Sequence, residues 1–317
     1  MIKYDLHLHS SFSTDSTEKM NVIVDKAIEL GLKGLCFTDH MDLYFPEKCS
    51  KKSGGDFTFD LNEYFDSLDF LRQRYKGRIE ILFGVETGLR NEPGLKAKCF
   101  KGYRQMAAEY PFDFIIGSTH CLEDIDPYWE EYWNGRTAEE GLNRYFDAIA
   151  ENCTYFDSFD SLGHLDYLVR YVSQEATVKS LEEKGLTGLL NRGVATISAK
   201  GIGDSQDYMK RLYGREVYDP ADFTDHIETI LRKVIDRGLS LEVNTAGLKY
   251  GLGFAHPRKE ILKMYRSMGG ELITIGSDAH AAVHLAYEFE NVGELLKTLG
   301  FKYYFVYKDR KPIGLTL

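Results

Sequence analysis

Two histidines, His7 and His9, stand two residues apart in the stretch DLHLHS near the start of the chain. If this stretch forms a strand, both imidazoles point to the same face, because successive side chains of a strand alternate. Two adjacent imidazoles are costly in a protein interior unless something holds them. A divalent metal ion binds neutral imidazoles together with ionised carboxylates, so the spacing predicts that both residues are ligands of one ion.

Other residues that can bind metal stand at the ends of later apolar stretches, within FTDH, GVETG, GSTH, GHLD and GSDAH. These residues are Asp39, His40, Glu86, His120, His164, Asp166, Asp278 and His280. A lone histidine at a strand end is more often a hydrogen-bonded polar residue than a ligand. Recurrence at matching points of successive stretches, however, favours one shared metal cluster.

Two carboxylates in these motifs, and three histidines outside them, have other interpretations. Asp39 is expected to orient an imidazole from behind rather than to bind the ion. Asp166 is either such an orienting partner or a structural residue. His226 is expected on a helix surface, and His256 and His284 in loops near the cluster.

The apolar stretches alternate with amphipathic ones, which predicts repeated strand–helix units. In NVIVDKAIELG, Ile23, Ala27 and Leu30 recur at helical spacing, and Gly31 fits the end of the helix. Stretches rich in Ile, Leu, Val and Phe suit buried parallel strands. Seven such units favour a closed or nearly closed α/β barrel, with an open doubly wound sheet as the alternative. The strand ends of a barrel meet at one rim, where active sites lie, so the candidate ligands would converge there.

The chain is expected to form a single barrel domain over residues 1–317, with two additions. The segment at about 171–220 is too long for an ordinary connection, so it is expected to be an insertion that acts as a lid or a subunit contact. The residues at about 301–317 are expected to form a hairpin outside the barrel.

Composition limits the function classes. The net charge is −10 and no long run of Lys and Arg occurs, so a nucleic-acid partner is not expected. The 5 cysteines form no Cys-x-x-Cys motif, which indicates a reducing compartment and a cytoplasmic location. No apolar run reaches about 18 residues, so no membrane span is expected.

The motifs DLHLHSSFSTDS, FTDH, GVE, GSTH, GHLD and GSDAH, in this order, resemble the polymerase and histidinol phosphatase (PHP) superfamily. The resemblance implies a distorted seven-stranded (β/α)7 barrel with the active site at the C-terminal rim of the strands. The opening motif and EVNTAG look most like the histidinol-phosphatase branch.

Transferred position by position, the resemblance implies three divalent ions, which could be zinc, manganese or iron. The first ion would be held by His7, His9, Glu86 and Asp278. The second would be held by Glu86 as a bridging ligand, with His120 and His164. The third would be held by Asp15, His40 and His280.

Such a cluster predicts metal-dependent hydrolysis of a phosphate monoester. The attacking group would be a metal-bound hydroxide held by Glu86, His120, His164 and Asp278, so no serine or cysteine nucleophile is needed. The resemblance implies L-histidinol phosphate as the substrate and L-histidinol as the product, in histidine biosynthesis. One alternative is a PHP-type phosphoesterase for another small phosphate ester or nucleotide. A non-catalytic metal-binding module is the other, although structural sites usually close their coordination shell with protein ligands.

Four further residues are candidates for substrate contacts. Asn244 ends the sixth strand, where no ligand is expected, so its side chain should face the site. Arg170 and Lys249 could place a positive charge on a phosphate oxygen, and Asp42 could pair with a cationic amine. For each of the four, an ordinary surface or salt-bridged residue is the alternative.

Overall fold

The computed structural model describes residues 1–190 and 211–317, and its centre is a parallel sheet. Along the sheet the strands follow the order β1 (Tyr4–Asp5), β2 (Gly34–Phe37), β4 (Glu80–Gly88), β5 (Phe114–Ser118), β6 (Ser161–Leu162), β7 (Ser240–Asn244) and β8 (Ile273–Gly276). The short strand β3 (His40–Met41) follows β2 and also pairs with β4. Every pair in this sheet is parallel, as expected for strands joined by helical crossovers.

The first and last strands meet and close the sheet. Leu8 forms a parallel bridge with Ala279, and the Leu6 N–H donates to the Ile275 carbonyl over 3.1 Å. Because β2 and β3 both pair with β4, they occupy one strand position, and the barrel therefore has seven strand positions. The predicted (β/α)7 barrel is therefore confirmed, and its strands β1 and β6 are each 2 residues long.

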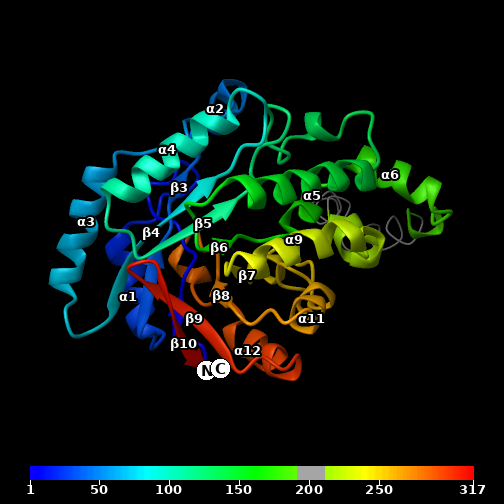
Figure 1. Ribbon diagram of the computed structural model, residues 1–317. Helices are drawn as coiled ribbons and strands as arrows, with labels where there is room; N and C mark the ends of the chain where they lie inside the picture. The colour runs from blue at the N-terminus through cyan, green and yellow to red at the C-terminus, as the bar shows by residue number, and fades with distance from the viewer. Residues whose placement is uncertain (191–210) are drawn as a thin grey trace.

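Helices cover the outside of the barrel, and the two chain ends lie close together (Figure 1). Among the described residues, the α-helices are α1 (Met20–Glu29), α2 (Glu47–Ser53), α3 (Leu61–Arg74), α4 (Lys96–Glu109), α5 (Ala138–Tyr155), α6 (Gln174–Glu183), α9 (Thr224–Asp236), α10 (Ala246–Lys249), α11 (Lys259–Ser267) and α12 (Phe289–Thr298). The short helical turns are η1 (Glu130–Trp133), η2 (Tyr167–Arg170), η3 (Tyr213–Val217), η4 (Pro220–Phe223) and η5 (Ala282–His284). Helix α1 buries Ile23 and Ala27, as the sequence spacing predicts.

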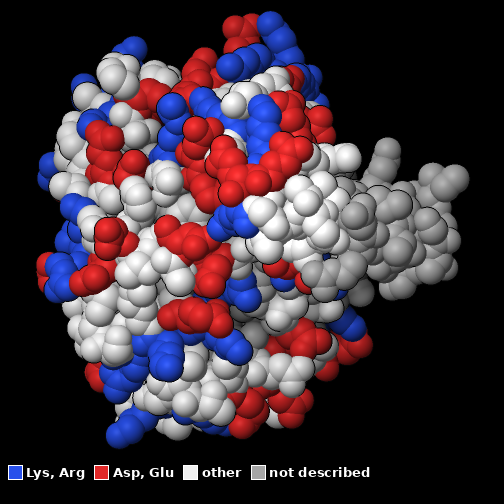
Figure 2. Space-filling model, turned by 90° about the vertical axis from the view of Figure 1, so that its right-hand side faces the viewer, with Lys and Arg blue, Asp and Glu red and all other residues white. Residues whose placement is uncertain are grey.

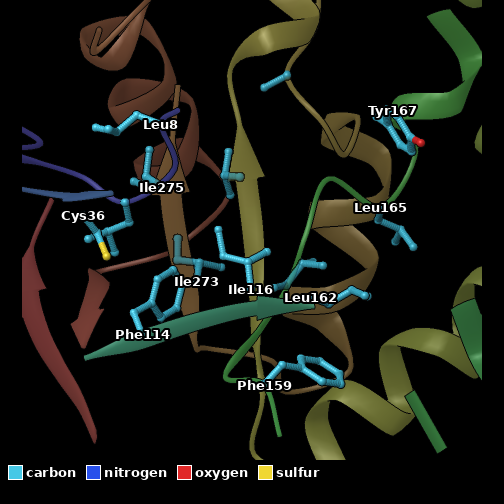
Figure 3. Close-up of a cluster of buried hydrophobic side chains, with 14 of the residues drawn as sticks. Leu8, Cys36, Phe114, Ile116, Phe159, Leu162, Leu165, Tyr167, Ile273 and Ile275 are labelled. Carbon is cyan, nitrogen blue, oxygen red and sulfur yellow. The ribbon is translucent and has the colours of Figure 1, made fainter. Parts of the chain in front are cut away.

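The core gathers apolar side chains from strands that are far apart in the sequence. Figure 3 shows Phe114 and Ile116 of β5 in one cluster with Leu162 of β6 and Ile273 of β8. These four side chains are at most 1% exposed. The packing of these apolar side chains holds the strands together. It therefore fixes the positions of the residues at the C-terminal ends of the strands.

The structure describes all of the C-terminal hairpin but only part of the segment predicted as an insertion. Helix α6 opens the segment predicted as an insertion, and η3 and η4 lie at its other end, whereas residues 191–210 lie outside the described residues. At the chain end, β9 (Tyr303–Lys308) and β10 (Lys311–Thr316) form an antiparallel hairpin.

Positive and negative side chains are mixed on the surface. On the face in Figure 2, the described Lys and Arg side chains are interspersed with Asp and Glu rather than joined into one basic patch. Within residues 1–190 and 211–317, no helix has the length and apolar character needed to cross a membrane.

Candidate metal centre

His7 and His9 lie in the extended segment after β1, on either side of the Leu8 bridge that closes the barrel. Both side chains are fully buried, and their rings lie 5.1 Å apart. Their Nε2 atoms face Asp278 Oδ1, at 3.9 Å from His7 and 3.3 Å from His9. The structure therefore brings together the pair that opens the chain and an aspartate that follows the last strand.

Glu86, in the middle of the long strand β4, lies at the centre of the site and is fully buried. Its Oε1 is 2.8 Å from His164 Nε2 and 3.2 Å from His120 Nε2. Its Oε2 is 3.3 Å from His7 Nε2 and 3.0 Å from His40 Nδ1. Its two oxygens therefore face two different sets of imidazoles, as a bridging carboxylate requires.

A third group lies nearer the solvent. Asp15 Oδ2 is 3.1 Å from His280 Nε2 and 3.6 Å from His40 Nε2. The Asp15 side chain is 41% exposed, whereas that of His40 is 11% exposed. All nine residues named as metal ligands from the sequence thus converge at the rim.

Several buried atoms of the cluster have no hydrogen-bond partner among the described residues. They are His7 Nε2, His9 Nε2, His40 Nδ1, Glu86 Oε2 and His164 Nδ1. Buried polar atoms without partners are costly, so their gathering in one place calls for a ligand. Four sets of three donor atoms lie within 4.8 Å of one another: His9, His40 and His280; His7, His9 and Asp278; His7, Glu86 and His164; and His40, Asp42 and His120. Imidazole nitrogens mixed with carboxylate oxygens at this spacing fit divalent metal ions.

The electrostatics suit metal binding at Glu86 and His9. Burial alone would raise the pKa of Glu86, but the imidazoles of His7, His120 and His40 outweigh it and hold that pKa well below its usual range. Burial also holds the pKa of His9 well below its usual value, and the neighbouring imidazoles add to this effect. An ionised carboxylate and a neutral imidazole are the forms that bind metal. At His7, His40 and His120, burial alone would lower the pKa, but the neighbouring carboxylates outweigh it and raise the pKa, so an ion must displace a proton from these rings.

Three side chains contact the Nδ1 atoms of proposed histidine ligands and so orient their rings. Asp42 Oδ2 is 2.8 Å from His120 Nδ1, and Ser13 Oγ is 3.1 Å from His9 Nδ1. Glu242 Oε1 is 2.5 Å from His7 Nδ1. Sequence reasoning missed Glu242, although an acidic residue two positions before Asn244 in the apolar strand LSLEVN was a usable signal.

Asp39 and Asp166 do not contact the ring of a proposed ligand. Asp39 accepts hydrogen bonds from the backbone and hydroxyl groups of Ser10 and Ser13, so it reaches His9 only through Ser13. Asp166 Oδ1 lies 2.8 Å from Nδ1 of the buried His256, and its Oδ2 accepts from a backbone N–H. Asp166 is therefore structural.

The two other histidines outside the motifs lie on different elements. His226 lies on α9 and pairs with Asp147 on α5, at 2.9 Å. His284 lies in η5.

A cavity of about 450 Å³ opens beside the cluster. Its wall includes Asp15, His40, Asp42, Glu86, His120, Asp126, Tyr128, Trp129, His164, Tyr167, Arg170, Tyr171, Tyr250, Asp278 and His280. The aromatic side of this wall could hold an apolar or ring-shaped part of a ligand. Trp129 is part of that wall.

Arg170 enters this cavity from η2. Its guanidinium lies over the rings of Tyr171 and Tyr250, at 4.7 and 4.5 Å from their centres. Its Nε and Nη1 are buried and have no hydrogen-bond partner among the described residues. An unpaired guanidinium beside a metal cluster can bind a phosphate oxygen.

The three other candidates for substrate contacts are already engaged with protein atoms. Lys249 Nζ donates to the backbone carbonyl of Asp278 over 2.9 Å, and Asn244 Nδ2 lies 3.4 Å from Asp278 Oδ2. Asp42 holds His120 with one oxygen, and its other oxygen is buried without a partner among the described residues. A substrate role for these three residues stays a prediction.

Two proteins of similar sequence are described as a histidinol-phosphatase and a probable histidinol-phosphatase. The PHP domain family matches residues 5–246 of the chain. A histidinol-phosphatase of Lactococcus lactis is 31% identical over 95% of this chain and 93% of its own length. A probable histidinol-phosphatase of Clostridium acetobutylicum is 27% identical over 94% of each chain.

A solved structure resembles the whole chain. It is the histidinol phosphate phosphatase of Lactococcus lactis in complex with zinc, L-histidinol and phosphate. The TM-score is 0.74 at 28% identity, and the match covers 98% of both chains.

Proposed function

Since the chain belongs to the PHP domain family, and within it to the histidinol-phosphatases, we propose that it hydrolyses L-histidinol phosphate to L-histidinol and phosphate. The observation that carries this proposal is the cluster of buried, unpartnered imidazole and carboxylate atoms at the barrel rim, next to an open cavity. This reaction belongs to histidine biosynthesis. A cytoplasmic location, expected from the cysteines, is part of the same proposal.

The cluster is proposed to hold three divalent ions, of which zinc is the first candidate because the similar Lactococcus lactis structure contains it. Their ligands would be the nine residues His7, His9, Asp15, His40, Glu86, His120, His164, Asp278 and His280. Bound divalent ions supply Lewis acidity, which activates water and neutralises phosphate charge. Glu86, whose two oxygens face different imidazoles, would hold two of the ions at a fixed separation.

Arg170 is proposed to hold the phosphate from the side opposite the cluster. Its buried Nε and Nη1 lack acceptors among the described residues, and phosphate oxygens would supply them. The stacked rings of Tyr171 and Tyr250 fix the plane of the guanidinium, so little side-chain freedom is lost on binding.

The cationic end of the substrate is proposed to meet Asp126, which lies on the same cavity wall as Asp42. One oxygen of Asp126 accepts the backbone N–H of Tyr128 over 2.8 Å. Burial raises the pKa of Asp126 to about 6, so an approaching ammonium group would favour the ionised carboxylate. Asp42 remains a second candidate through its oxygen that lacks a partner.

The test is phosphate release from L-histidinol phosphate by the zinc-loaded protein, with a panel of sugar phosphates and nucleotides for comparison. We expect histidinol phosphate to have the highest kcat/KM, and we expect a chelator to abolish turnover. A higher kcat/KM for another ester would reassign the substrate. Full turnover in metal-free protein would refute the metal-dependent reaction itself.

A further inference from the structure

Glu242 of β7 is a buried carboxylate that contacts two different parts of the metal centre. Its Oε1 is 2.5 Å from His7 Nδ1, and its Oε2 accepts the backbone N–H of His164 over 2.7 Å. Its exposed fraction is 1%. His7 follows β1 and His164 follows β6, and Glu242 contacts both from β7.

The charge of Glu242 has no ordinary partner. No Lys or Arg side chain within residues 1–190 and 211–317 forms an ion pair with it, and its further contact is Asn244 Nδ2 at 3.3 Å. A buried carboxylate without a cation is strongly destabilising. The positive charge that balances Glu242 must therefore be carried by the imidazole of His7 or by an ion bound to that ring.

Resting on the proposed function, we infer that Glu242 is a positioning residue that couples the occupancy of two of the proposed ions. By accepting the Nδ1–H of His7, it leaves Nε2 of that ring free as a ligand in the correct tautomer. By holding the backbone of His164, it fixes the position of a ligand of the second ion. The ion beside His7 and the ion beside His164 then do not load independently.

Asp42 provides a matched comparison. It is also buried and also holds a histidine, but it contacts a single proposed ligand, His120, at 2.8 Å. Loss of Asp42 should therefore loosen one ion, whereas loss of Glu242 should loosen two.

The substitution Glu242→Gln tests the coupling with almost no change of volume. The carboxylate accepts the ring N–H of His7 on Oε1, and the backbone N–H of His164 and the amide of Asn244 on Oε2. A glutamine has a single acceptor oxygen, so its NH2 group must face either His7 Nδ1–H or His164 N–H. One of the two contacts becomes repulsive whichever way the amide turns.

The experiment measures bound zinc per chain by elemental analysis after dialysis against a series of buffered free-zinc concentrations. At a concentration where the wild type holds three ions, we expect Asp42→Ala to hold two and Glu242→Gln to hold one. Each loosened ion should bind about 10–100-fold more weakly, as is typical when an outer partner of a ligand is lost. Glu242→Gln with wild-type loading, or with the loss of one ion only, would overturn the inference.

A second variant covers the case in which Glu242→Gln does not fold. Glu242→Asp keeps the charge and both acceptor oxygens, but it is one methylene shorter and cannot span both partners. We expect two zinc affinities to fall together in this variant, and a fall in one alone would contradict the coupling. Histidinol phosphate turnover by the wild type is measured on the same preparation. Absence of turnover there would refute the proposed function, whereas the ion counts decide the coupling.

Discussion

At Glu86, one carboxylate faces five imidazoles, and the arrangement explains why this position tolerates burial of a charge. Its oxygens lie within 3.6 Å of ring nitrogens of His7, His9, His40, His120 and His164. Ser118 Oγ donates to Oε1 over 2.6 Å and completes its environment. Five rings around one acid would repel one another if all were protonated, so divalent ions are the charges that this geometry fits best.

Glu86→Ala should therefore remove a ligand from two ions at once. We expect phosphate release to fall by ~100-fold or more, since even outer partners of ligands are typically worth 10–100-fold. His226→Ala is the control, because His226 pairs with Asp147 away from the cluster. Activity and bound zinc are measured for both variants. Equal and small losses in the two variants would show that Glu86 is not at the centre of the site.

Asp126→Asn should discriminate between substrates. Loss of its charge should lower kcat/KM about 10-fold or more for histidinol phosphate, since hydrogen bonds to charged groups are worth about 1.5–3 kcal/mol. An aryl phosphate without an amine should be hydrolysed at nearly the wild-type rate. Asp42→Ala provides the comparison: because Asp42 holds His120, we expect it to slow both substrates. Equal losses for both substrates in Asp126→Asn would remove Asp126 from amine recognition.

Single residues differ in how far the sequence can predict them. His-x-His and the strand-end motifs mark candidate ligands because their residue types are unusual in buried strands. Glu242 and Asp126 could not be assigned in this way, since their roles depend on which residue lies opposite in the folded chain. Asp42 illustrates the same limit, because the sequence does not show that His120 occupies one of its oxygens.

At the scale of elements, the site requires glycines near the strand ends, because the side chains of the metal centre pack directly against the backbone there. A Cβ at Gly276, the last residue of β8, would lie 2.2 Å from His7 Cβ and 2.9 Å from Glu242 Oε1. A Cβ at Gly163, just before His164, would lie 2.2 Å from Ser118 Oγ. Only glycine, which has no Cβ, fits these two close approaches.

Gly276→Ala should therefore both destabilise the barrel and displace His7. We expect the free energy of unfolding in urea to fall by about 1–3 kcal/mol, the usual effect of overpacking, and zinc binding to weaken. Gly293→Ala in α12 is the control, because its nearest neighbour would be Ile2 Cδ1 at 3.5 Å. There we expect no loss of stability, or a gain of up to about 1 kcal/mol from helix propensity. If the two variants unfold alike, the close approach at Gly276 does not constrain the site.

The repeating units could be predicted because apolar strands and amphipathic helices have different periods. The β1 and β6 strands are two residues long, and only the barrel around them defines their ends. The pairing of Leu8 with Ala279 joins residues from the two ends of the barrel, so no local pattern could reveal it.

For the molecule as a whole, one end of the barrel is closed by packing and the other end carries the candidate metal ligands. The hairpin of β9 and β10 covers the N-terminal end, where Tyr307 contacts the ring of Phe114 and the hydroxyl of Ser240, the first residues of β5 and β7. Arg310 Nε lies 2.5 Å from Asp160 Oδ2 just before β6. The candidate ligands lie at the opposite rim, so stability can be maintained at one end while the other end serves chemistry.

The ions proposed for that rim should also stabilise the whole fold. Their ligands extend from His7, after the first strand, to His280, after the last, so the complete site exists only when the barrel is closed. A ligand present at 1,000 times its Kd that binds only the folded state adds about 4 kcal/mol per site. We therefore expect a chelator to lower the Tm by at least about 5 °C. Thermal unfolding followed by circular dichroism, with and without the chelator, gives this shift.

The same measurement on two variants separates metal binding from other effects of the chelator. His226→Ala should show the full shift, because its side chain lies on the outer face between α9 and α5. His7→Ala should show a smaller shift, since at least one ion is already loosened before the chelator is added. If the zinc-loaded wild type, with its ions verified by elemental analysis, unfolds at the same temperature after chelation, then the rim does not bind ions in a way that depends on barrel closure. In that case the cluster would contribute to catalysis without contributing to the stability of the fold.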